Sequence, residues 1–103
     1  MDIFARIKRL VISRKVLFTE KAADEMRNDD LTREDVYEAI LNAPCIRKTL
    51  SSRNPTTASR EKLYVIKGMT FDGIDVYTKG KILKRLGEEV FYVLISSKRS
   101  TEI

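Results

Sequence analysis

The dipeptide Asp72-Gly73 lies between two β-rich segments, and it constrains the fold of this chain more than any other feature. Asp-Gly is a strong signal for a two-residue hairpin turn, because that turn needs residues that tolerate positive φ. A two-residue turn places Leu63 opposite Ile82 and so fixes the register of the whole hairpin. We therefore predict an antiparallel sheet in the second half of the chain, with its central strand over residues 74–85.

A second two-residue turn is predicted at Gly87-Glu88, and in its register Tyr77 lies opposite Lys98, with the two Cβ atoms roughly 5 Å apart. Together the two hairpins predict one largely apolar sheet face, formed by Leu63, Val65, Lys67, Met69, Phe71, Ile74, Val76, Thr78, Gly80, Ile82, Phe91, Val93 and Ile95. The opposite face alternates basic and aromatic side chains, including Lys62, Tyr64, Tyr77, Lys79, Lys81, Tyr92 and Lys98. A slip of one residue would exchange the two faces.

The first 44 residues have helical periodicity, and Asp2, Thr19 and Thr32 are N-cap candidates ahead of three segments. Val16-Leu17-Phe18 is expected to be a short connector, and Pro44 ends the last helix. The segment 51–60 has almost no apolar residues and predicts a flexible loop, either functional or only disordered. We therefore expect a single α+β domain over residues 1–103 (1–44 mainly helical, 45–103 mainly sheet), with two or three N-terminal helices on one face of a small antiparallel sheet.

Several kinds of catalytic site are excluded because the chain has no His and only one Cys. It can form neither a Ser-His-Asp nor a Cys-His pair, and Cys45 cannot form a disulfide within the chain. The basic half contains no Asp and Glu cluster that suggests a two-metal site, so we expect no metal and no cofactor. No segment has the pattern of a membrane span or signal peptide, and the cysteine usage favours a cytoplasmic location.

The net charge of +5 is unevenly distributed along the chain. Residues 17–45 carry a net charge of −5, whereas residues 1–16 carry +4 and residues 46–103 carry +6. A basic face of this kind attracts polyanions, although Lys and Arg also serve simply to keep a small protein soluble.

The predicted basic face has the residue types that bind single-stranded RNA. Phosphates would be neutralised by Lys62, Lys79, Lys81 and Lys98, with Arg60 and Arg85 extending the patch, and bases would stack on Tyr64, Tyr77 and Tyr92. RNA can also be cleaved without His or metal, by attack of its 2′-hydroxyl, if one group removes the proton, cations stabilise the phosphate and another group protonates the leaving oxygen. Tyr and clustered Lys can fill these roles. The alternative interpretation is an ordinary solvated sheet face.

Five short segments resemble the MqsR-like toxins of toxin–antitoxin modules, within the wider RelE-like class of small endoribonucleases: Ile7–Val11, Val16–Ala22, Arg47–Leu50, Val76–Lys79 and Leu94–Lys98. The resemblance implies a RelE-like fold and an mRNA interferase that arrests growth by cutting mRNA, with or without the ribosome. It also implies a cognate antitoxin as partner. Carried over residue by residue, it makes Tyr77, Lys98 and Lys48 the catalytic candidates. The chain contains no Gln or His, so a Gln of the family and a His of a related branch have no counterpart here.

Two further hypotheses use the same fold without catalysis. A binding module would hold RNA or a protein on the basic face. A protein that binds only other proteins would use the acidic second and third helices as its interface.

Overall fold

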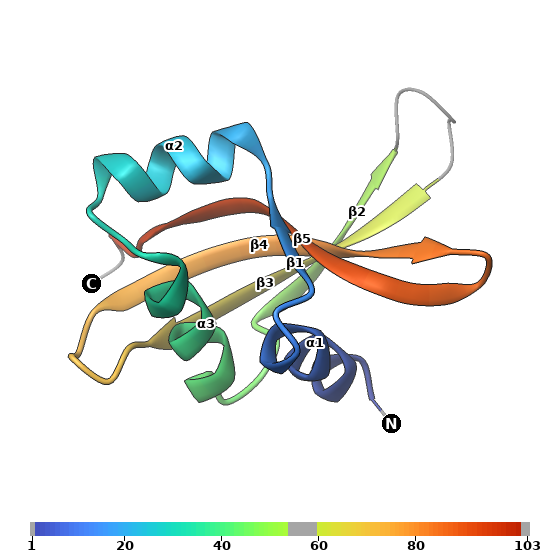
Figure 1. The fold of residues 1–103 in the computed structure, drawn as a ribbon, viewed down its shortest axis with the longest axis horizontal. Helices are drawn as coiled ribbons and strands as arrows, with labels where there is room; N and C mark the ends of the chain where they lie inside the picture. The colour runs from blue at the N-terminus through green and yellow to red at the C-terminus, as the bar shows by residue number, and fades with distance from the viewer. Residues whose placement is uncertain (1, 54–59, 102–103) are drawn as a thin grey trace.

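The structure is a computed structural model, and it describes residues 2–53 and 60–101. Three helices precede most of the sheet: α1 (Ile3–Ile12), α2 (Glu20–Asn28) and α3 (Arg33–Asn42). The five strands are β1 (Val16–Phe18), β2 (Lys48–Arg53), β3 (Arg60–Met69), β4 (Asp75–Arg85) and β5 (Glu88–Arg99), in the spatial order β1-β5-β4-β3-β2 (Figure 1). The α+β class is therefore confirmed, with three helices.

The segment Val16–Phe18 is strand β1, so the prediction of a connector there is wrong. It pairs in parallel with β5, which makes the sheet mixed rather than antiparallel. The Tyr92 amide donates to the Lys15 carbonyl and the Thr19 amide donates to the Leu94 carbonyl. Three residues are too few to show a periodicity, and pairing with β5 decides their conformation.

All three predicted N-caps are confirmed. The side chains of Asp2, Thr19 and Thr32 each accept a hydrogen bond from the backbone amide three residues later. At α3 the cap is reciprocal, because the Asp35 carboxylate accepts from the Thr32 amide at 3.0 Å. These caps fix where each helix begins and hence which side chains it turns toward the sheet.

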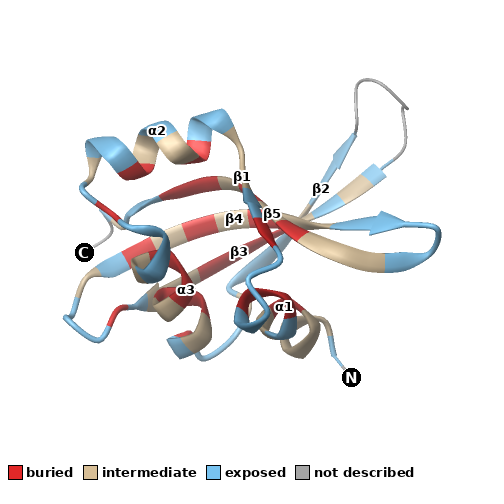
Figure 2. Ribbon diagram, in the orientation of Figure 1, coloured by how far each residue is buried: buried red, intermediate tan, exposed pale blue. Residues whose placement is uncertain are grey.

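The helices cover one face of the sheet, and the core lies between them (Figure 2). From the helices it receives Ile7, Leu10, Val11, Met26, Val36, Tyr37, Ala39 and Ile40, and from the sheet Tyr64, Ile66, Val76, Tyr92 and Leu94. A Cβ on Gly68 would lie 1.8 Å from the Ala39 carbonyl oxygen, so α3 packs directly on the β3 backbone. Among the described residues no helix covers the other sheet face, which carries Lys67, Tyr77 and Lys98 and is called the open face below.

The β3–β4 turn is one residue longer than predicted. The Gly73 amide donates to the Thr70 carbonyl at 3.0 Å, the Thr70 amide donates to the Ile74 carbonyl at 2.9 Å, and Gly73 has a φ of +85°. This is a three-residue loop with a left-handed glycine at its end. The register becomes Met69 opposite Asp75, which corrects the predicted pairing by one residue.

Within the β3–β4 hairpin, the shifted register exchanges the two faces of β3 and leaves those of β4 unchanged. Tyr64 and Ile66, predicted on the basic face, point into the core, whereas Leu63, Val65, Lys67 and Met69 lie on the open face. Strand β4 keeps its predicted faces, since Val76 is in the core and Ile74 and Ile82 pack against it.

The β4–β5 turn is centred on Leu86 and Gly87, with φ of 54° and 81°, and not on Gly87-Glu88. Register shifts between Lys79 and Gly80 and between Leu83 and Lys84 then change the pairing along the hairpin. Near the turn, these changes place Tyr92 and Leu94 in the core and leave Phe91 and Val93 outside it. The predicted faces of this part of β5 are therefore wrong. Beyond both shifts, Tyr77 pairs with Lys98 as predicted.

The predicted loop 51–60 is partly wrong, because residues 51–53 belong to β2 and Arg60 begins β3. Residues 54–59 lie outside the described residues. Within the described chain, no helix combines the length and the apolar character needed to cross a membrane.

Candidate nucleic-acid interface

Tyr77 occupies the middle of a row of three side chains on the open face. Strand β4 is central, so Tyr77 has a partner on each side: Lys67 on β3 and Lys98 on β5. Directly paired residues project from the same face of a sheet. The Lys98 Nζ atom lies 5.5 Å from the centroid of the Tyr77 ring. The Tyr77 side chain is thus flanked by two lysine side chains.

A second basic row crosses the same face. Lys48 pairs with Val65, and Val65 pairs with Lys79, so the two lysines flank the valine. Lys79 lies two residues from Tyr77 on one strand and therefore on the same face. Lys48 is separated from Tyr77 by two strand spacings and one row, roughly 12 Å along the sheet. Among the predicted catalytic residues, the fold brings Tyr77 and Lys98 together and holds Lys48 apart.

The remaining predicted RNA contacts divide between the two sides of the sheet. Lys81 lies on the open face, where its Nζ atom contacts the Glu61 carboxylate at 2.7 Å. Arg60 lies opposite Arg53 at the far end of the β2–β3 hairpin. Successive side chains of a strand point to opposite faces, so Lys62 lies on the same face as Tyr64, which is covered by the helices. This contradicts its predicted place on the open face. Lys62 borders a groove of about 940 Å³ that Ile3 and Arg6 also line, together with Arg60, Glu61 and Lys81.

Tyr64 and Tyr92 are unable to stack bases, and this prediction is wrong. Their exposed fractions are 7% and 0%, and both belong to the hydrophobic core. Burial, with Tyr64 nearby, raises the pKa of Tyr92. Among the described residues its hydroxyl has no hydrogen-bond partner. The cause is the pairing register at both turns, which sends each ring to the helix side.

Lys67 is the residue that the sequence reasoning missed, because the two-residue turn assigned it to the apolar face. A usable signal was present. Gly73 also fits the last position of a three-residue loop, and that loop places Lys67 opposite Tyr77.

After the residues that pair with β1, strand β5 forms hydrogen bonds to acidic side chains of α2 and of the residue that follows it. The Glu25 carboxylate accepts hydrogen bonds from the Ser96 hydroxyl at 2.8 Å and the Ser97 amide at 3.1 Å. The Asp29 carboxylate accepts from the Arg99 amide at 2.8 Å. Partial burial opposes ionisation of Glu25, but these hydrogen bonds, with Lys21 and Lys98 nearby, lower its pKa. The carboxylates of Glu25 and Asp29 thus position the strand that carries Lys98.

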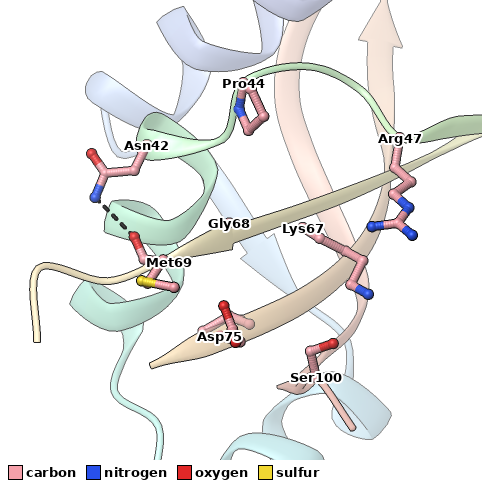
Figure 3. A pocket seen from close by; sticks show the side chains of 9 residues that line it. Asn42, Pro44, Arg47, Lys67, Gly68, Met69, Asp75 and Ser100 are labelled. Atoms are coloured by element: carbon pink, nitrogen blue, oxygen red, sulfur yellow. Dashed lines mark hydrogen bonds between the residues drawn. The ribbon is translucent and has the colours of Figure 1, made fainter. Parts of the chain in front are cut away.

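A pocket of about 450 Å³ lies at the turn end of the open face (Figure 3). Most of its lining comes from two places: the ends of β3 and β4, which give Lys67, Met69 and Asp75, and the end of α3 with the connection after it, which give Asn42, Pro44 and Arg47. Ser100, just beyond β5, also lines it. The Asn42 side-chain amide donates to the Met69 carbonyl at 2.9 Å and joins these two walls. Lys67 therefore belongs both to this pocket and to the row of Tyr77.

In the part of the chain that the structure describes, no group of three or more Cys, Asp or Glu side chains is placed to hold a metal ion. Comparison with family models finds no match, and comparisons with curated proteins and with solved structures find no significant match.

Proposed function

We propose that this chain is a small RNA-binding protein of the endoribonuclease class, which holds single-stranded RNA on its open face and cleaves it through the RNA's own 2′-hydroxyl. The observation that carries the proposal is the position of Tyr77 between Lys67 and Lys98. A phosphodiester on this row would meet two lysine side chains and a hydroxyl that can donate or accept a proton.

The cleavage step assigns one role to each member of the row. Lys98 acts as the general base and removes the proton of the 2′-hydroxyl. A bond forms between the 2′-oxygen and phosphorus, the bond from phosphorus to the 5′-oxygen breaks, and the Tyr77 hydroxyl gives its proton to that oxygen. The Lys98 ammonium then returns a proton to Tyr77. Lys67 and Lys79 stabilise the negative charge of the crowded phosphate.

Binding along the strand is assigned to the second basic row. Lys48 and Lys79 are spaced to contact phosphates on either side of Val65, and Lys81 extends the row along β4. Lys48 accordingly acts in binding rather than in proton transfer, because it lies a row away from Tyr77 and two strands across.

The biological setting is part of the same proposal. On the resemblance to MqsR-like and RelE-like toxins, the substrate is mRNA in the cytoplasm and a cognate antitoxin restrains the activity. Growth arrest on expression, relieved by Lys98→Ala, is the expected behaviour of such a toxin.

Incubation of purified protein with a mixed-sequence RNA in EDTA tests the proposal. Wild type is expected to leave 2′,3′-cyclic phosphate ends, and Lys98→Ala is expected to leave the RNA intact. Lys8→Ala, which removes the same charge from α1 on the helix side, is the matched control and should cut like wild type. Equal cutting by Lys98→Ala would refute the site.

A module that binds RNA without cutting it is the second candidate. The spread of the cations favours it, because they occupy two rows whereas only one row contains a tyrosine. RNA bound with a steep salt dependence but left uncut, on and off the ribosome, would support this candidate.

A further inference from the structure

The pocket beside Lys67 combines apolar walls with polar groups of opposite charge. Met69, whose exposed fraction is 48%, and Pro44 supply apolar surface. Asp75 lies directly across from Met69 on β4. Figure 3 shows the Asp75 carboxylate and the cationic side chains of Arg47 and Lys67 around the same hollow. The size of this hollow is within the range of pockets that hold small molecules, and its convergent polar groups would fix the orientation of a ligand.

The carboxylate of Asp75 decides which part of an RNA fits here. It lies at the turn end of the open face, two residues from Tyr77 and on the same side of β4. A carboxylate repels a phosphate, so the backbone is directed to the lysine rows instead. An ionised carboxylate is an acceptor only, with two oxygens that can take a pair of parallel N–H donors.

We propose that this pocket binds the guanine base of the nucleotide next to the scissile phosphate, an inference that rests on the proposed binding of RNA by the open face. Guanine is the RNA base whose Watson–Crick edge presents two adjacent donors, N1–H and N2–H, and these match the Asp75 carboxylate. Its O6 and N7 acceptors form the adjacent edge of the base, which the cationic groups of Arg47 and Lys67 would contact. Adenine, cytosine and uracil each place an acceptor where the second carboxylate oxygen needs a donor.

The position of the pocket joins base recognition to the reacting row. Asp75 and Tyr77 are roughly 7 Å apart along β4, and Lys67 borders both the pocket and Tyr77. A base seated against Asp75 therefore leaves its own phosphate within reach of Tyr77 and Lys98. Met69 is suited to cover the base because its thioether is soft and adapts to flat surfaces.

Titration with the four nucleoside 3′-monophosphates, followed by backbone amide NMR, tests the inference. Wild type is expected to bind 3′-GMP about tenfold or more tightly than 3′-AMP, 3′-CMP or 3′-UMP, as one bidentate base contact requires. The largest shifts should fall at residues 67–77. Asp75→Asn should remove the preference, whereas Asp72→Asn, the same charge change in the neighbouring turn, should retain it. Thermal unfolding of both variants checks that each is folded.

The outcomes separate this inference from the proposed function. Equal binding of the four nucleotides, or an unchanged preference in folded Asp75→Asn, overturns the guanine pocket and leaves RNA cleavage standing. Guanine-selective binding without cleavage of any RNA supports the pocket and removes the catalytic assignment. Failure to bind both 3′-GMP and guanosine-containing RNA overturns both.

Discussion

Tyr77 on β4 and Lys98 on β5 are direct cross-strand partners, and the lysine Nζ atom lies 5.5 Å from the tyrosine ring centroid. The pair has two separable properties, since the ring offers a surface for a base or a cation and the hydroxyl offers a proton. Lys67 completes the row on the other side.

Replacement of Tyr77 by Phe is expected to separate these properties. The ring stays, so RNA affinity should change less than threefold, while loss of the proton donor should lower the single-turnover cleavage rate by about 10²–10⁴-fold. Fluorescence anisotropy with a 2′-deoxy-blocked RNA gives the affinity, and gel-resolved cleavage gives the rate. A Tyr77→Phe protein that cuts at the wild-type rate would show that the hydroxyl takes no part.

The salt dependence of RNA binding should distinguish the two sides of the sheet. Each lysine that contacts a phosphate contributes about −0.7 to the slope of log K against log salt for a single strand. Lys67→Ala is therefore expected to make the slope shallower by about that amount. Lys62→Ala removes the same charge from the same strand, but on the face covered by the helices. It should leave the slope of the salt dependence unchanged. A larger effect for Lys62 than for Lys67 would place RNA in the groove beside α1 instead.

Tyr92 gives a test of the corrected register that is independent of RNA. Its buried hydroxyl has no partner among the described residues, so Tyr92→Phe should leave the free energy of unfolding unchanged or raise it. Tyr92→Ala should lower it by about 3–5 kcal/mol through loss of the ring from the core. Urea unfolding measures both. Loss of RNA binding in a stably folded Tyr92→Phe protein would contradict the core position of this ring.

The helices could be predicted from the sequence because their signals are local. Asp2, Thr19 and Thr32 each cap a helix through an amide three residues away, and Thr32 with Asp35 forms a capping box. Strand β1 could not be predicted in this way. Val16–Phe18 becomes a strand by pairing with β5, more than seventy residues later in the sequence.

The candidate site could be predicted only in part, because face assignment depends on turn length. Asp72-Gly73 is compatible with a loop of either two or three residues. The three-residue loop shifts the register of β3 by one residue, which moves Lys67 to the open face and Tyr64 into the core. On β5 the pairing of Tyr77 with Lys98 was predicted although the assumed turn was wrong. The two register shifts of the β4–β5 hairpin together restore the pairing that the assumed turn gives at that end.

The stability of the protein in acid should depend on Glu25, which ties α2 to the edge of β5. Its pKa in the folded state lies below the ordinary value of 4.5, despite partial burial, because Ser96 and Ser97 donate to the ionised carboxylate and cations lie nearby. A carboxyl with a lowered folded pKa stabilises the native state above its unfolded pKa, and this contribution is lost as the pH falls through the folded value.

Glu25→Gln should therefore lower the free energy of unfolding by about 1–2 kcal/mol at pH 7, since hydrogen bonds to a charged acceptor are replaced by bonds to a neutral one. The difference from wild type should shrink steadily as the pH falls below 4.5. Glu34→Gln, which removes a carboxylate with a side chain 64% exposed, should change stability by well under 1 kcal/mol. Urea unfolding from pH 7 to pH 3 measures all three proteins. A wild-type advantage over Glu25→Gln that stays constant across this range would mean that the folded-state ionisation of Glu25 contributes nothing to stability.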